Sequence, residues 1–245
     1  TYTSVTVDAD LVADGKTLTV TGTEALTTTS IDGDLDLSAY AGAVTSATVV
    51  NTNDVSLKAG TKANTFVAQG NTAGKTLTID AATATGGTIT FNDGGSVQGH
   101  ITATGVVSDV DFVDAFKGTG DVSITTGAAD GKTIDFGTST TYDSVTVNAD
   151  LVADGKTLTV TGTEALTITS KEGNLDLKAY AGAVTSTVLN TTAVNLKAGT
   201  KANTIAAQGN ANGVALTVDA ATTEAASLIT FNDGGSVDGD IKVTG

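Results

Sequence analysis

The stretch ADLVADGKTLTVTGTEALT occurs twice in this chain, at Ala9–Thr27 and, without a single change, at Ala149–Thr167. The two occurrences lie 140 residues apart (149 minus 9). The match continues beyond them, since FNDGGSV begins both at Phe91 and at Phe231. Self-similarity at a fixed period is the sequence signature of a repeat architecture, so this duplication decides how the rest of the chain is interpreted.

The duplication divides the chain into residues 1–140, a first repeat unit, and residues 141–245, a second, truncated copy of the same unit. The register slips by one residue near Asn51, which matches Asn190, and then recovers. The second copy stops at Gly245, before its counterpart of VVSDVDFVDAFKG. We therefore interpret the sequence as part of a longer protein.

The composition argues against several classes of protein. There are 27 acidic and 12 basic residues, all lysines, giving a net charge of −15, and there is no Cys, Pro, Met or Trp. An acidic chain without arginine is poorly suited to nucleic acid, which is bound through Arg and Lys patches. The lack of cysteine excludes a disulfide framework. No apolar run approaches 18 residues, so we expect no membrane span.

Short segments of alternating apolar and polar residues recur along the chain and predict half-buried strands. Examples are TLTV at Thr17–Val20 and TLTID at Thr76–Asp80, separated from their neighbours by turn sequences such as DG, AGT and NDGG. The apolar side of each alternating pair should face inward. The residues predicted to face inward are Val5, Val7, Leu18, Val20, Leu35, Leu37, Leu77, Ile79, Ile89 and Phe91.

These patterns favour an all-β fold, a repetitive parallel β-solenoid-like array of short strands. Strands with two inward side chains suit coils that stack and bury a narrow apolar strip. The alternative is a set of tandem β-sandwich modules, although an immunoglobulin-type sandwich would normally carry a buried Trp. Helical signals are weak, and the best candidates for a short helix are Val107–Gly118 and Ala220–Ser227.

Differences between the two copies indicate which positions face the core. Thr28 is replaced by Ile168, which predicts an inward position. Ile31 is replaced by Lys171, and Ser38 by Lys178, which predicts that these side chains face solvent.

The chain contains segments such as LDLSAYAGAVTSATVV at Leu35 and SLKAGTKANTFVAQGN at Ser56. They resemble the lattice-forming parts of bacterial surface-layer (S-layer) proteins, of the RTX-like kind exported by type I secretion. The resemblance covers most of the chain as a style of sequence, rich in Thr, Ala, Gly and Val, acidic and free of Cys. GTKANTF at Gly60 and GTKANTI at Gly199 have the frame of a degenerate RTX calcium repeat, with Asn64 and Asn203 at the position of its calcium-binding aspartate.

The resemblance implies a structural, secreted protein of the bacterial cell surface that self-associates into a lattice or filament. Anchoring to a cell-surface polysaccharide would then use a region outside this chain. Calcium is the cofactor that it implies, because such lattices contain RTX-like repeats.

Carboxylate and amide oxygens, the ligands that Ca²⁺ prefers, are abundant in the turns. No cluster has the spacing of an EF-hand or of a strict RTX repeat, so solvated turns remain the alternative interpretation. The candidate calcium ligands are Asp93, Asp233, Asp238 and Asp240.

We expect no catalytic site and no enzymatic activity. The single histidine, His100, is replaced by Asp240 in the second copy. A serine nucleophile would therefore have no histidine base that both units keep.

Three functional classes are left open: an S-layer lattice subunit, the repeat stalk of a large secreted adhesin, and an ice-binding protein. Ice binding is prompted by the T-x-T segments at Thr17–Thr19 and Thr76–Thr78. It is disfavoured because VSL, LDL and IDF strands should interrupt the threonine pairs.

Overall fold

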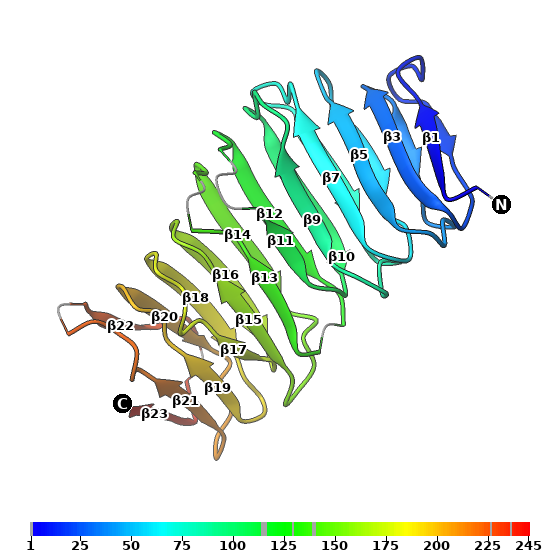
Figure 1. Ribbon diagram of the computed structural model, residues 1–245. Coiled ribbons are helices and arrows are strands. Elements are labelled where there is room, and N and C mark those ends of the chain that lie inside the picture. Colours follow the sequence, from blue (N-terminus) through cyan, green and yellow to red (C-terminus); the bar gives the residue numbers. More distant parts are fainter. Residues whose placement is uncertain (1, 114–116, 129, 139–140, 226, 236) are drawn as a thin grey trace.

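The computed structural model describes residues 2–113, 117–128, 130–138, 141–225, 227–235 and 237–245, with the side chain of Asp233 also outside the description. The described residues form 23 strands and no helix. Successive strands alternate between two sheets, so that each pair of strands makes one coil and about eleven coils stack along one axis (Figure 1). The predicted all-β, parallel β-solenoid fold is confirmed.

The two sheets hold alternate strands of the chain. Sheet A consists of β1 (Ser4–Asp8), β3 (Ala25–Ile31), β5 (Val44–Val50), β7 (Asn64–Gln69), β9 (Ile89–Asp93), β11 (Val110–Phe112), β13 (Lys132–Asp135), β15 (Thr157–Thr161), β17 (Asn174–Asp176), β19 (Val194–Lys197), β21 (Ala215–Asp219) and β23 (Asp240–Thr244). Sheet B consists of β2 (Thr17–Thr19), β4 (Asp34–Asp36), β6 (Val55–Lys58), β8 (Thr76–Asp80), β10 (His100–Val106), β12 (Asp121–Thr126), β14 (Ser144–Ala149), β16 (Leu166–Lys171), β18 (Val184–Leu189), β20 (Asn203–Gln208) and β22 (Ile229–Asp233).

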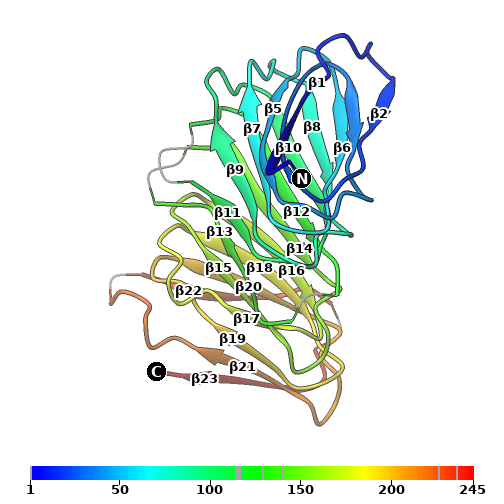
Figure 2. The same ribbon diagram turned by 45° about the vertical axis from the view of Figure 1, so that its right-hand side comes forward.

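Every pairing between these strands is parallel, as between β3 and β5 or between β20 and β22. Sandwich modules are built from antiparallel strands, so the tandem-sandwich alternative is wrong for this chain. Pairing also continues across the boundary between the two sequence units, since β12 pairs with β14 and β13 with β15. Figure 2 shows the two sheets as opposite sides of one stack.

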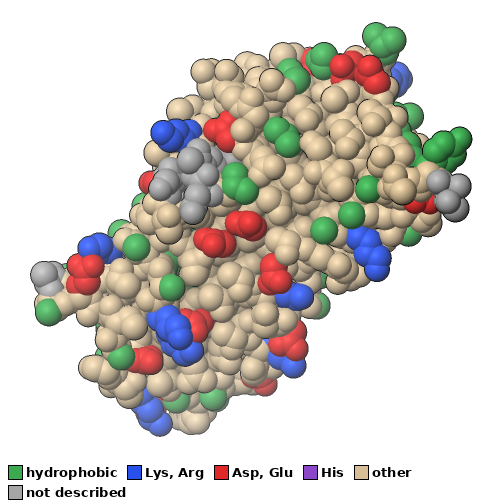
Figure 3. All heavy atoms as spheres, viewed as in Figure 1, with side chains coloured by type: hydrophobic (Ala, Val, Ile, Leu, Met, Phe, Trp, Pro, Cys, Tyr) green, Lys and Arg blue, Asp and Glu red, His purple; other side chains and the backbone are tan. Residues whose placement is uncertain are grey.

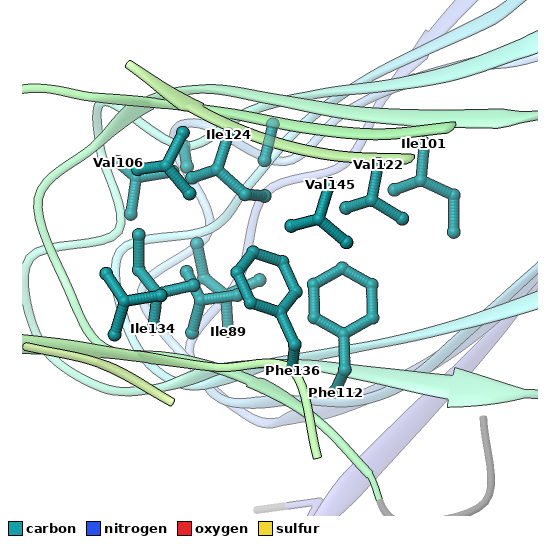
Figure 4. Packing of buried hydrophobic residues seen from close by; sticks show 14 of the residues in the cluster. Ile89, Ile101, Val106, Phe112, Val122, Ile124, Ile134, Phe136 and Val145 are labelled. Atoms are coloured by element: carbon teal, nitrogen blue, oxygen red, sulfur yellow. The ribbon is translucent and has the colours of Figure 1, made fainter. Parts of the chain in front are cut away.

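The core is the thin layer between the two sheets, filled by up to three apolar side chains from a strand (Figure 4). Of the residues predicted to face inward, Leu35, Leu37, Leu77, Ile79, Ile89 and Phe91 are buried, and Val7, Leu18 and Val20 pack against the core from half-buried positions. Val5 is 37% exposed because β1 pairs only with β3 among the described strands. The copy comparison holds for Thr28 and Ile168, which are buried, and for Ile31 and Lys171, which are exposed. Lys178 is also exposed, but its counterpart Ser38 is half-buried and its hydroxyl donates to Asp36.

Phenylalanine side chains form a ladder along the axis in the middle of the stack. The ring centroids of Phe66 and Phe91 lie 5.9 Å apart, those of Phe91 and Phe112 4.5 Å, and those of Phe112 and Phe136 5.5 Å. Each ring comes from the next strand of sheet A or the residue just after it. Stacked rings at this spacing add to the burial energy of each coil, which ties neighbouring coils together.

Neither of the two suggested helices forms among the described residues. Val107–Gly118 contains strand β11, and residues 114–116 of this segment lie outside the described residues. Ala220–Ser227 is a turn region, within which residue 226 is also outside the description. The aspartates and phenylalanine of DVDF occupy alternate sides of a short strand, so the period there is that of a strand and not of a helix.

The sequence repeat contains an odd number of described strands. Strand β1 at Ser4 corresponds to β14 at Ser144, thirteen strands later, and β10 at His100 corresponds to β23 at Asp240. Two strands make one coil, so one repeat equals six and a half coils. Each segment of the first copy therefore lies in the sheet opposite to that of its counterpart in the second copy.

Candidate functional site

The predicted calcium ligands lie at the ends of strands, where the chain turns from one sheet to the other. Asp93 ends β9 in sheet A, and both of its carboxylate oxygens already accept backbone hydrogen bonds. Oδ1 accepts from the Gly95 amide at 2.6 Å, and Oδ2 accepts from the Lys117 amide at 2.9 Å. The second of these bonds comes from the next coil, so this carboxylate links two coils.

The other three candidates lie in the second copy. Asp233 ends β22 in sheet B, and its side chain is outside the described residues. Asp238 is exposed in the following turn, and Asp240 begins β23 in sheet A, where it is also exposed. Asp93 and its counterpart Asp233 lie in opposite sheets, so the four candidates do not form one shared site. Within the described residues, no group of three His, Cys, Asp or Glu side chains is arranged to hold a metal ion.

Many carboxylates instead accept hydrogen bonds from the coil that follows. Oδ1 of Asp32 accepts from the amides of Thr52 and Asn53, and Oδ2 accepts from the Thr52 hydroxyl at 2.5 Å. In the second copy Glu172 accepts from the amides and hydroxyls of Thr191 and Thr192. Asp32 and Glu172 both adopt a positive φ, 57° and 68°, so the capping geometry survives the change of side-chain length.

These hydrogen bonds lower the pKa of both Asp32 and Glu172. Desolvation alone would raise the pKa of Asp32, but the hydrogen bonds from Thr52 and Asn53 outweigh it, and the pKa lies below its usual value. The pKa of Glu172 is lowered by the corresponding balance, with the hydrogen bonds from Thr191 and Thr192 opposing desolvation. Hydrogen bonds to the charged form stabilise it, so these carboxylates are held ionised.

Some acids pair with lysine across neighbouring strands. The Lys58 Nζ lies 3.0 Å from Asp36 Oδ2, and the Lys197 Nζ lies 2.7 Å from Asp176 Oδ2. Hydrogen bonds from Ser38, followed by those from Lys58, lower the pKa of Asp36 to about 2. The same pair therefore occurs in sheet B in the first copy and in sheet A in the second.

Asn64 and Asn203, which occupy the RTX aspartate position, close a turn with their side-chain hydrogen bonds. Asn64 is buried, its Oδ1 accepts from the Gly60 amide at 2.8 Å, and its Nδ2 donates to the Gly60 and Lys62 carbonyls. Asn203 makes the same three bonds to Gly199 and Lys201. An asparagine can donate and accept at once, which a carboxylate cannot, so these side chains close the turn.

A ladder of hydroxyl groups lies on the outer side of each sheet. In sheet A it consists of Thr6, Thr27, Thr45, Thr65 and Thr90. A bulge in β5 pairs Thr27 with Ser46, although the hydroxyl oxygens of Thr27 and Thr45 still lie 3.3 Å apart. In sheet B it consists of their counterparts Thr146, Thr167, Thr185, Thr204 and Thr230, which are paired in register from strand to strand. We call the outer side of β1, β3, β5, β7 and β9 face 1, and that of β14, β16, β18, β20 and β22 face 2.

The sheet B ladder continues toward the N-terminus through Ser123, Thr102, Thr78 and Ser56. The expectation that VSL, LDL and IDF strands interrupt the threonine pairs holds at Thr17 and Thr19, which pair with Asp34 and Asp36 of β4, but a single row of hydroxyls continues through the strands of sheet B from β6 onward. LDL belongs to β4 at the N-terminal end of sheet B, VSL contributes Ser56 itself, and IDF belongs to β13 in sheet A. Consecutive strands of the chain lie in different sheets, so segments that interrupt the sequence need not interrupt a face.

Face 2 is hollowed beside its ladder. A cavity of about 200 Å³ is lined by residues that include Thr169, Lys171, Thr187, Leu189 and Gln208. A second, more open hollow of about 430 Å³ lies along the loop Asp150–Asp154, next to Glu172 and Thr191. Both are shallow surface features. Hydroxyl, amide and aliphatic groups line the first, together with the charged side chains of Asp150 and Lys171.

Comparison with protein-family models, with curated proteins and with solved structures finds no match to this chain. Among the described residues no helix is long and apolar enough to cross a membrane.

Proposed function

We propose that this chain is a non-catalytic structural protein of the bacterial cell surface, a subunit of an S-layer lattice that assembles by side-by-side packing of solenoids. The observation that carries the proposal is the duplicated hydroxyl ladder on two opposite faces of one stack. A lattice subunit needs contacts on more than one side, and a repeat of six and a half coils supplies two related surfaces with the same five threonines.

The chemistry of the surface supports a structural role. Acidic side chains that could have formed catalytic pairs are used to cap the next coil, as with Asp32 and Glu172, or to bind lysine, as with Asp36. The parallel stack also gives the chain long, regular sides (Figure 1). Secretion to the cell exterior and attachment to a surface polysaccharide by a region outside this chain belong to the same proposal.

Calcium enters the proposal as a bridge between neighbouring solenoids. With a net charge of −15, packed copies repel one another, and divalent ions would relieve that repulsion. Among the candidates whose side chains are described, Asp238 and Asp240 are exposed, whereas both oxygens of Asp93 already accept hydrogen bonds from backbone amides. We therefore expect bridging at the turns near Asp238 and Asp240.

The test is to image purified protein by electron microscopy with millimolar Ca²⁺, with chelator, and with NaCl at equal ionic strength. The proposal predicts ordered arrays with Ca²⁺ that disperse on chelation, and a melting temperature raised by Ca²⁺ beyond the effect of NaCl. Protein that stays monomeric at high concentration with Ca²⁺ would overturn the lattice function. Equal effects of the two salts would remove calcium from it.

The alternative is the repeat stalk of a large adhesin, in which the solenoid holds a distant binding region away from the cell. A stacked, unbranched array of coils suits this task as well. The same micrographs separate the two functions, because a stalk should appear as single rods and a lattice subunit as sheets.

A further inference from the structure

We infer that face 1 of one molecule docks onto face 2 of a second copy of this chain, so that each solenoid contacts a neighbour on either side. This contact rests on the proposed lattice function and names the surface that builds it. Its partner is therefore another molecule of the same sequence.

The geometry of the repeat supports this partner. The hydroxyl ladders of face 1 and face 2 have threonines at corresponding positions of the two copies, but they lie on opposite sheets, six and a half coils apart. At about 4.8 Å per coil, the two ladders are offset by about 31 Å along the axis. When face 1 of one molecule packs on face 2 of another, the first molecule keeps a free face 2 and the second keeps a free face 1. Further molecules can therefore add at both sides, each shifted along the axis by the same offset.

The threonines of the ladders are identical in the two copies although they are not buried. Thr27, Thr45 and Thr65 have identical counterparts in the second copy, and so do Thr6 and Thr90. Exposed or half-buried positions elsewhere have changed between the copies, as in the half-buried Ser38 and the exposed Lys178. The short, β-branched side chains lose little rotamer entropy when covered, which suits an interface.

Both faces are almost free of charge in a strongly acidic molecule. Among the outward side chains of face 1 described here the charged one is Asp8, and on face 2 it is Lys171. Figure 3 shows few charged side chains over the strands of face 1. Asp8 corresponds to Asn148, and Lys171 corresponds to Ile31, so the two faces differ by two charges. Opposite charge favours contact of face 1 with face 2 over contact between like faces.

The shapes of the two faces also differ in a complementary way. Ile31 projects from face 1 with 44% of its surface exposed. Face 2 has the 200 Å³ hollow lined by Thr169, Thr187 and Leu189, with Asp150 and Lys171 also in its lining. An isoleucine side chain covered by this hollow would lose its contact with water, which stabilises the docked pair.

The size of the contact explains why it suits an array. Five strands about 4.8 Å apart and about five residues long give a face of roughly 400 Å², so that a pair buries roughly 800 Å² in total. This is below the range of stable isolated complexes, so one contact is weak and repeated contacts reinforce one another. The strands turn steadily from β1 to β23 in Figure 1, and a twisted face fits a second twisted copy better than a flat ice crystal.

The decisive experiment exchanges residues between the copies. The variant Asp8→Asn, Ile31→Lys gives face 1 the side chains that β14 and β16 already carry, so the fold is preserved. Sedimentation velocity across a concentration series should show self-association weakened about tenfold, because two charges have changed at one face. Adding Asn148→Asp and Lys171→Ile should restore association by exchanging the roles of the faces. Ser38→Lys, which adds one positive charge outside both faces and matches Lys178, is the control and should associate as the parent does.

Cross-linking gives an independent measurement, since the chain has no cysteine. Thr45→Cys protein mixed with Thr185→Cys protein should form mixed disulfide dimers in clear excess over either protein oxidised alone. If arrays form but the exchange variant associates like the parent and the mixed dimers show no excess, the docking contact is wrong and the lattice function stands. If the parent chain never associates, the docking contact and the lattice function are both overturned. If that monomer slows the recrystallisation of ice, the hydroxyl ladders are ice-binding surfaces.

Discussion

The identical stretches Ala9–Thr27 and Ala149–Thr167 fold into the same strands in opposite sheets and reach different burial. Leu18 is half-buried on β2, which pairs only with β4 among the described strands, whereas Leu158 is 1% exposed on β15, which pairs on both sides. In a solenoid each strand covers its neighbours, so the burial of a side chain depends on the coils above and below. Identical residues in the two copies can therefore contribute different amounts to the stability of the fold.

The largest expected difference between the copies is at this leucine. Leu158→Ala should lower the free energy of unfolding by about 2–5 kcal/mol, because it leaves a cavity between two covering coils. Leu18→Ala should cost clearly less, since the site is half-exposed and can collapse. Urea unfolding of the two variants measures both. Equal losses would show that burial does not differ between the two copies in solution.

A smaller effect is expected at the carboxylate caps. Asp32→Asn keeps the shape but removes the charge from hydrogen bonds to Thr52 and Asn53, and should cost about 1–2 kcal/mol at pH 7. The folded pKa of Asp32 lies below its usual 3.8, so the ionised carboxylate stabilises the fold above that pH. This contribution is lost as the pH falls through the folded pKa.

The stability difference between the parent and Asp32→Asn should accordingly shrink below about pH 4, as followed by urea unfolding at several pH values. Glu172→Gln in the second copy should show the same trend, because the pKa of Glu172 is lowered by equivalent bonds. A difference that is independent of pH would mean that the charge of these caps plays no part in stacking.

The smallest effect concerns a pair of tyrosines in the matching AYAGAVTS segments. The Tyr40 hydroxyl donates to the Glu24 carbonyl at 2.9 Å, whereas the buried Tyr180 hydroxyl has no hydrogen-bond partner among the described residues. Tyr40→Phe should cost about 0.5–1.5 kcal/mol, and Tyr180→Phe should be neutral or stabilising. Thermal unfolding of the two variants tests this, and an equal cost would show that Tyr180 is bonded in solution.

Strand positions and inward residues followed from the sequence because alternation with a period of two is a local property. Leu77, Ile79 and Ile89 were placed correctly for this reason. The sheet to which a strand belongs was not predictable, because it requires counting every strand before it. Short strands such as β11 and β17 give little signal, having three residues each.

Coil length also varies too much to set the register from the sequence. Residues paired one coil apart are separated by 17 positions between Thr17 and Asp34, but by 26 between Lys132 and Leu158. The hydroxyl ladders were missed for the same reason, although each T-x-T segment was visible. The use of Asp32 as a cap depends on an amide in the following coil, and such contacts follow only from the stacking.

The central claim is that matching threonines of the two copies face opposite ways, and spin-label distances test it directly. Labels at Thr45 and Thr159, on the same sheet and five coils apart, should lie about 24 Å apart. Labels at Thr45 and Thr146 are only four and a half coils, about 22 Å, apart along the axis, but they project outward from opposite sheets whose backbones are about 10 Å apart, so their distance should exceed about 24 Å. Pulsed dipolar spectroscopy of the two double-cysteine variants therefore should give the longer distance for the pair that is closer in sequence. A shorter distance for Thr45 and Thr146 would place both copies on the same face and contradict the account.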